Sequence, residues 1–119
     1  MFGKLLQLGL GALLVAGLCA AEQKSVSGYL MDKACSADAM KKGEKAAKEH
    51  GLDCALMDDC AKTGFGVFTS DGKFLSFDAA GNKRALAALK ASKKKVDIQV
   101  TVTGDVSGDT IKVASLKMM

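Results

Sequence analysis

The stretch VDIQVTV, residues 96–102, decides the fold class, because apolar and polar side chains alternate at every one of its positions. Alternation with this period predicts a β-strand with one buried face. Gly104 interrupts the pattern and predicts a bulge or a bend in the strand. A tight turn at residues 107–109 then leads into a last strand over residues 111–118, with a slip near Ser115.

Three further strands are predicted upstream of this hairpin, over residues 25–31, 65–70 and 73–78. Gly28 lies inside the first of them and predicts a bulge or a close approach of another backbone. The dipeptide Asp71-Gly72 predicts a two-residue turn between the second and third strands, because both central positions of such a turn need a positive φ.

An amphipathic helix is predicted between the third and fourth strands. Leu86 and Leu89 fall on one face of this helix, which should be buried. Asp78 or Asn82 is placed to cap its N-terminus. The lysines at positions 93–95 suit its C-terminal end, where positive charge interacts favourably with the helix dipole.

The order of elements is therefore strand, long polar segment, strand, strand, helix, strand, strand. A helix between the third and fourth of five strands is the layout of the OB-fold, a partly open Greek-key barrel. The predicted fold is mainly β (α+β): a small five-stranded OB-like barrel. A minimal barrel would not need the polar segment, residues 32–63, which we interpret as a helical insertion between the first two strands.

Two segments carry a resemblance to known proteins. The closing hairpin, VTGDV at residues 102–106 leading into TIKV at residues 110–113, is similar to that of small exported bacterial OB-fold proteins. The opening segment SGYLMDKAC, residues 27–35, resembles the first strand of uncharacterised exported proteins with a Cys/His-containing insertion. The resemblance implies a barrel with a binding role, and it implies no particular reaction.

Residues 1–21 have the organisation of a secretory signal peptide. Lys4 supplies a positive start, an apolar run over residues 5–18 follows, and small residues precede the cleavage site. A lipid anchor at Cys19 is disfavoured, because a leucine precedes it where a small residue is usual. We therefore expect an exported domain over residues 22–119, in the periplasm or outside the cell, with no membrane span after cleavage.

Removal of Lys4 with this segment lowers the formal net charge from +4 to +3. A charge this mild supports solubility and favours no polyanionic partner, so nucleic acid is not expected as a partner. We expect a monomer whose partner is a small molecule or an envelope protein. Tyr29 is the one candidate ligand-binding residue outside the insertion.

The insertion is predicted to contain two helices. The first covers residues 36–50, with Ser36 as its N-cap and Gly51 as its stop. The second covers roughly residues 54–62, with Asp53 as its N-cap.

The insertion also contains the residues that could perform chemistry. Every cysteine of the expected mature domain and the only histidine of the chain lie in it or at its edge, namely Cys35, His50, Cys54 and Cys60. Three thiols and one imidazole are a complete tetrahedral zinc set, and they also suit Cu(I), so zinc or copper is the only cofactor expected. A thiol-redox role is a further interpretation of the same residues.

A disulfide is the competing interpretation, and an oxidising compartment permits it. On one straight helix, Cys54 and Cys60 would have Cα atoms roughly 9–10 Å apart, which is too far for a bond. Cys35 would then bond to either Cys54 or Cys60, which leaves one cysteine unpaired.

The function expected from the sequence is that of a small exported binding module of unknown ligand with a disulfide-pinned insertion. The alternatives are a zinc- or copper-binding or thiol-redox protein, and a structural envelope protein. An enzyme is not expected, because the sequence has no supported Ser/His/Asp set, no glycine-rich phosphate loop and no haem-attachment motif.

Overall fold

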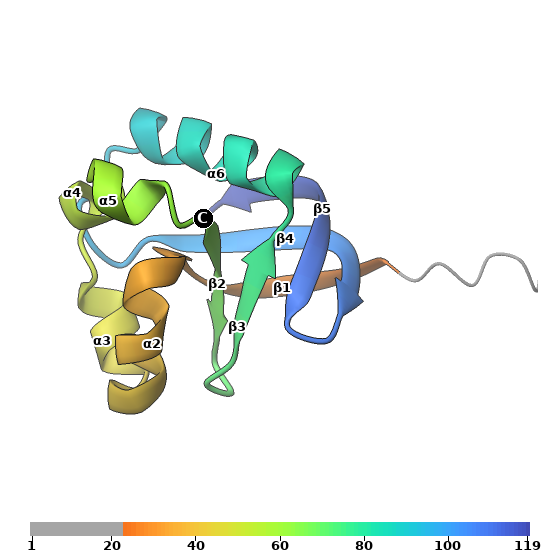
Figure 1. Cartoon of the computed structure of the whole chain (residues 1–119), viewed down its shortest axis with the longest axis horizontal. Coiled ribbons are helices and arrows are strands. Elements are labelled where there is room, and N and C mark those ends of the chain that lie inside the picture. Colours follow the sequence, from red (N-terminus) through yellow and green to blue (C-terminus); the bar gives the residue numbers. More distant parts are fainter. Residues whose placement is uncertain (1–22) are drawn as a thin grey trace, which may run out of the picture.

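The structure, a computed structural model, describes residues 23–119. The expected signal peptide, with Cys19, lies outside the described residues. The described part combines strands and helices in an α+β fold, with one helix between the third and fourth strands (Figure 1). The elements are β1 (Gln23–Asp32), α2 (Lys33–Lys42), α3 (Glu44–Glu49), α4 (Leu52–Ala55), α5 (Asp58–Ala61), β2 (Phe65–Thr69), β3 (Phe74–Phe77), α6 (Ala79–Ala91), β4 (Gln99–Ser107) and β5 (Thr110–Met118).

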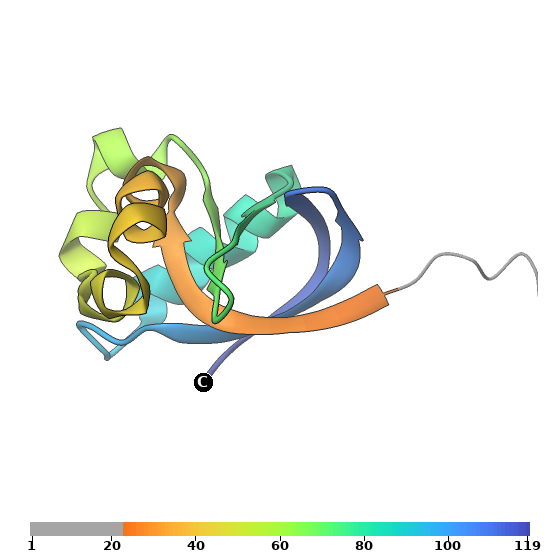
Figure 2. The ribbon, with the colours of Figure 1, turned by 90° about the horizontal axis from the view of Figure 1, so that it is seen from below.

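The five strands form one mixed sheet, and Figure 2 shows how strongly β1 curves within it. β1 pairs antiparallel with β2 and β4, as do β2 with β3 and β4 with β5, whereas β3 and β5 run parallel. The pairing order β1-β2-β3-β5-β4 returns from β4 to β1, so the sheet closes on itself. A side chain at Gly28 of β1 would collide with the backbone of Phe68, which confirms the predicted close approach.

The main core lies between the sheet and α6. Ile98, Val100 and Val102 are at most 2% exposed, as the alternation predicts. Ala85 and Leu89 of α6 are fully buried in the same cluster. Burial of apolar surface stabilises a fold by roughly 25 cal/mol per Å², so this cluster is the main source of stability in a small domain.

Asp78 begins α6 and ties the helix to the sheet. Its Oδ1 accepts hydrogen bonds from the backbone N–H groups of Gly81 and Val113, both at 3.1 Å. The N-cap predicted at Asp78 is therefore confirmed. Asn82, the other candidate, instead accepts a hydrogen bond from the N–H of Phe65 at the start of β2, at 2.8 Å.

The fourth strand begins later than its alternation predicts. β4 starts at Gln99, and Val96, expected on the buried face, is 50% exposed. Asp97 has a left-handed backbone with a φ of 54°, and its N–H donates to the carbonyl of Lys48 in the insertion at 2.8 Å. Contact with the insertion thus turns the first predicted residues away from the sheet.

The connection between β2 and β3 is a three-residue loop rather than the predicted two-residue turn. The N–H of Thr69 donates to the carbonyl of Lys73 at 2.8 Å, across residues 70–72. Gly72 has a φ of 83°, whereas Asp71 is not among the residues with positive φ. A two-residue turn of the predicted type would need a positive φ at both positions.

The irregularity predicted at Gly104 and Ser115 is confirmed. Thr103 pairs with Ser115 and Gly104 pairs with Val113, so one residue of β5 is left without a partner in the ladder. A Cβ at Gly104 would collide with the carbonyl of Lys112, which explains why glycine is needed there.

The insertion folds as four short helices, gathered at one end of the sheet (Figure 1), rather than as the two predicted. Asp32, not Ser36, caps α2, and Gly43, with a φ of 96°, separates α2 from α3. α4 begins after Gly51 without a side-chain cap, so the cap predicted at Asp53 is wrong. None of the helices in the described part of the chain is long and apolar enough to cross a membrane.

Candidate metal centre

Asp32 is the residue around which the site is built. It ends β1 and its side chain is fully buried. Its Oδ2 accepts a hydrogen bond from the backbone N–H of Cys35 at 3.0 Å, which caps α2 and fixes Cys35 in the first turn. Burial raises the pKa of Asp32, but contact with His50 and the Cys35 N–H outweighs burial, so this pKa lies below its usual value. Asp32 is therefore a buried carboxylate.

His50 faces the other oxygen of this carboxylate. It follows α3 as the C-cap residue, and its side chain is 8% exposed. Its Nε2 lies 2.9 Å from Oδ1 of Asp32, an ion-pair distance without the alignment of a hydrogen bond. Among the described residues, neither nitrogen of the ring nor Oδ1 of Asp32 has a hydrogen-bond partner. Buried polar atoms without a hydrogen-bond partner are unusual in folded proteins, and a bound ion or water is one explanation for them.

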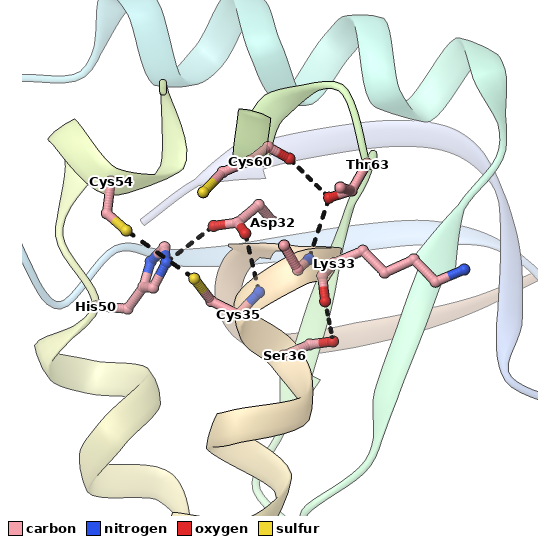
Figure 3. Close-up of polar contacts among 9 residues, drawn as sticks. Asp32, Lys33, Cys35, Ser36, His50, Cys54, Cys60 and Thr63 are labelled. Atoms are coloured by element: carbon pink, nitrogen blue, oxygen red, sulfur yellow. Dashed lines mark hydrogen bonds and ion pairs between the residues drawn. The ribbon is translucent and has the colours of Figure 1, made fainter. Parts of the chain in front are cut away.

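The three cysteines converge beside this pair (Figure 3). The Sγ atoms of Cys35 and Cys54 lie 4.0 Å apart, and the Sγ atoms of Cys35, Cys54 and Cys60 all lie within 4.8 Å of one another. In a tetrahedral zinc site with Zn–S bonds of about 2.3 Å, the sulfurs are roughly 3.8 Å apart. The three thiols are therefore close to the spacing that a metal ion requires.

The prediction that Cys54 and Cys60 share one helix is wrong. The chain leaves α4 at Leu56, and Met57 takes an extended backbone with φ −65° and ψ 138° before α5 begins. This break turns α5 back toward the start of α2. The two sulfurs, which a straight helix would separate, therefore lie in one cluster.

Contacts outside the cluster fix the positions of α4 and α5. Leu52 and Ala55 of α4 are buried in the main core, so Cys54 between them faces the other way. Thr63, after α5, accepts a hydrogen bond from the N–H of Ala34 at 3.1 Å and donates one to the carbonyl of Cys60 at 2.7 Å. Thr63 thus ties the segment with Cys60 to the first turn of α2 (Figure 3).

The cysteines are free thiols in the structure, and each is half-buried. Burial, Asp32 and Cys54 raise the pKa of the Cys35 thiol to about 12. The same three causes raise the pKa of Cys60. Thiols in this state are poor nucleophiles at neutral pH, because the thiolate is the reactive form. In the metal-free protein, Cys35 and Cys60 are therefore poor candidates for a reactive thiol.

A pocket of about 400 Å³ opens onto the cluster between α2 and α3. Cys35, His50 and Cys54 line its inner end, and Met31 lies beside them. Cys60 belongs to the thiol cluster but is not part of the pocket lining. The site is therefore reached from solvent on one side.

Tyr29, the ligand-binding candidate outside the insertion, does not belong to this site. It lines a separate hollow of about 220 Å³ that includes Gly28, Phe68 and Gln99. Its hydroxyl donates to Oε1 of Glu44 at 3.4 Å, a long contact at the surface.

Asp32 is the member of the site that the sequence analysis missed. The available signal was its position three residues before Cys35 at the end of a predicted strand, which is the spacing of an N-cap and the N–H group it binds. The interpretation of Ser36 as the cap, which is wrong, left this spacing unused. Ser36 instead donates its hydroxyl to the carbonyl of Lys33 at 2.7 Å.

Comparisons of this chain with protein-family models, with curated proteins and with solved structures found no match.

Proposed function

We propose that this chain is a small exported protein with an OB-like barrel whose insertion binds a thiophilic metal ion, Zn²⁺ or Cu⁺, through Cys35, Cys54 and Cys60. The observation that carries the proposal is the meeting of these three sulfurs within 4.8 Å. Thiolates are the ligands that select these two ions over harder cations such as Mg²⁺ and Ca²⁺.

The strand order supports the OB-like barrel. A closed sheet in the order β1-β2-β3-β5-β4, with a helix between β3 and β4, agrees with the arrangement expected from the sequence. The barrel supplies a rigid base, since β1 ends directly at Asp32 and so brings the site to one end of the sheet.

The buried pair of Asp32 and His50 also supports a metal site. Groups beside the ligands of a metal commonly orient those ligands by hydrogen bonds, and Asp32 fixes Cys35 in this way through the Cys35 N–H. A ring nitrogen of His50, a carboxylate oxygen of Asp32 and the sulfur of Cys35 lie within 4.8 Å of one another. Cys35 belongs to this group and to the thiol group, so the pair borders the proposed ion on the side of Cys35.

The ion would also stabilise the insertion. Its helices have 10, 6, 4 and 4 residues. Isolated helices shorter than about 12–15 residues are marginal in water. An ion bound by α2, α4 and α5 together would link these helices, since metal-binding free energy adds directly to folding free energy.

A disulfide between Cys35 and Cys54 is the alternative that the same geometry favours next. Their sulfurs, 4.0 Å apart, are in contact but are not at the bonding distance of about 2.05 Å. In that alternative Cys60 is unpaired, and the protein is the binding module with a disulfide-pinned insertion that the sequence analysis expects.

Native mass spectrometry of the mature protein, purified without reductant, separates the two. We expect one added Zn²⁺ or Cu⁺ per chain, lost on chelation, with all three thiols then open to alkylation. Serine substitution of Cys35, Cys54 or Cys60 should abolish stoichiometric binding. Met57→Leu is the matched control, because Met57 offers an exposed sulfur between α4 and α5.

The disulfide alternative predicts a different result. A mass lower by the pair of hydrogens that a disulfide loses, with one thiol left to alkylate and no ion bound after reduction and reloading, would overturn the metal site.

A further inference from the structure

The pocket between α2 and α3 gives the proposed ion an open side. Cys35 and Cys54 face the pocket, and Cys60 lies outside its lining. Structural zinc sites use four protein ligands, whereas sites that handle an exogenous molecule keep one position open. Three thiolates that leave one side of the ion open to a pocket have the second arrangement.

His50 is not aimed to close this position. Its Nε2 is 2.9 Å from Oδ1 of Asp32, and the group that includes its ring nitrogen contains only one of the three thiols. The three sulfurs all lie within 4.8 Å of one another, and His50 is not part of that group. The fourth ligand of a tetrahedral ion would therefore come from the pocket.

The walls of the pocket carry charges of both signs. Asp38 and Lys42 of α2 form an exposed ion pair at 3.2 Å, and Glu49 of α3 lies across from them on the lining. A volume of about 400 Å³ falls at the small end of ligand pockets, which cover roughly 300–1,000 Å³. The lining thus offers a cation and two carboxylates around a space suited to a small zwitterion.

We propose that the fourth ligand is a small amino thiol of the class of free cysteine, with its sulfur on the ion and its ammonium and carboxylate groups on Glu49 and Lys42. This inference rests on the metal site proposed above. The class follows from the chemistry at the two ends of the pocket: a thiophilic ion would lie at the inner end, and charges of both signs line the wall.

The step is a ligand exchange without oxidation. The incoming S–H bond breaks, its proton goes to solvent, and a bond forms between the thiolate sulfur and the ion. With a water as the fourth ligand beforehand, the bond between that water and the ion would break, and the water would leave. The ion keeps its charge, so no electron acceptor is needed, and reversal of the step returns the thiol.

Native mass spectrometry of the Zn²⁺-loaded protein with added L-cysteine tests the inference directly. We expect a ternary complex of chain, ion and one cysteine, and no such complex with L-serine, which lacks the sulfur. In the Co²⁺-loaded protein, cysteine should shift the ligand-field bands, because a sulfur replaces an oxygen donor at the ion. 2-Mercaptoethanol, a thiol without the two charges, should bind more weakly than cysteine.

Substitutions in the pocket wall test the recognition of the charges. Lys42→Gln and Glu49→Gln should each weaken cysteine binding by about two- to fivefold, because exposed ion pairs contribute little. Both should leave Zn²⁺ binding unchanged. Lys41→Gln is the matched control, since Lys41 is exposed on the same helix and is not part of the lining.

The outcomes separate the two proposals. If no ion binds to the chain, the proposed function fails and this inference fails with it. If Zn²⁺ binds but cysteine gives no ternary complex, the open position is refuted and the metal site stands. Loss of Zn²⁺ in His50→Ala, with the Co²⁺ bands of a nitrogen donor in the unchanged protein, would identify His50 as the fourth ligand and overturn the inference.

Discussion

At the scale of single residues, Asp32 does most to organise the site. One of its oxygens caps α2 through the N–H of Cys35, and the other contacts His50. A single buried carboxylate therefore sets the positions of two elements that meet at the cluster. Because it is fully buried, removal of its charge leaves its partners without compensation from solvent.

Asp32→Asn should therefore lower the free energy of unfolding of the metal-free protein. The asparagine can still accept the hydrogen bond from Cys35, but the contact with His50 loses its charge, and we expect a loss of about 1–3 kcal/mol. Urea denaturation followed by circular dichroism measures this change. Asp38→Asn is the control, because Asp38 is exposed on α2 and its loss should cost less than about 0.5 kcal/mol. Equal effects of the two substitutions would show that Asp32 has no special role.

The free energy of unfolding should fall at acid pH and again at alkaline pH, which gives its pH profile an acid limb and an alkaline limb. The pKa of Asp32 is lowered from 3.8 in the folded state, so its contribution is present above that value and is lost as the pH falls through the folded pKa. The pKa of Cys35 is raised from 9.0 to about 12, so the folded metal-free protein loses stability as the pH rises through this interval.

Free energies of unfolding, measured across this pH range with reductant and chelator present, check both limbs. Cys35→Ser should remove the alkaline limb. Asp32→Asn should flatten the acid limb and also reduce the alkaline limb, because Asp32 is one of the groups that raise the pKa of Cys35. An alkaline limb that persists unchanged in Cys35→Ser would mean that other groups, such as lysines, cause it.

At the scale of elements, the strands follow their sequence pattern closely and the insertion does not. Alternation identified the buried positions Ile98, Val100 and Val102 correctly. In the insertion, the polar run gave no clear periodicity, and the breaks depend on single backbone conformations. The clearest is Gly43, where a φ of 96° and a ψ of −172° separate α2 from α3.

Gly43→Ala should destabilise the protein although it adds no collision. No atom lies within 4 Å of a Cβ built at this position, so the cost comes from the backbone conformation alone, and we expect about 1–3 kcal/mol. Gly51→Ala is the matched control, because Gly51 has a φ of −88° and its nearest contact is 3.7 Å away. Thermal denaturation of both variants tests this reasoning, and a tolerated alanine at Gly43 would refute it.

At the scale of the whole molecule, the site joins an insertion of short helices to a closed sheet. The main core lies between the sheet and α6 and also includes Leu52 and Ala55 of α4. A second cluster, which includes Met31, Ala39 and Ala47, packs the first two helices of the insertion. The proposed ion would link three of the four short helices. Its removal should therefore loosen the insertion and leave the sheet intact.

Hydrogen exchange with and without Zn²⁺ should show this difference. We expect added protection in residues 33–61 and little change in β4 and β5, with a gain of about 2.7 kcal/mol at a hundredfold excess of free ion over Kd. The variant with serine at all three cysteines should show no such gain. Protection spread evenly over the whole chain would contradict a local role of the ion.

The sequence by itself determined the order of the strands along the chain, the position of α6 with two candidates for its cap, the bulge at Gly104, and the thiols and imidazole of the site. These features depend on local periodicity, turn chemistry and composition, which act over a few neighbouring residues. Even the cap at Asp32 left a local signal, in its spacing from Cys35.

Only the tertiary structure decided which of these residues meet. Cys35, Cys54 and Cys60 come together because the chain breaks at Met57 and turns α5 back onto α2. His50 reaches Asp32 because the turn at Gly43 returns α3 along α2 to the end of β1. Apart from Cys54 and Cys60, which are six positions apart, these contacts join residues 18 or more positions apart in the sequence. No local pattern encodes them, because their free energy comes from the docking of whole elements.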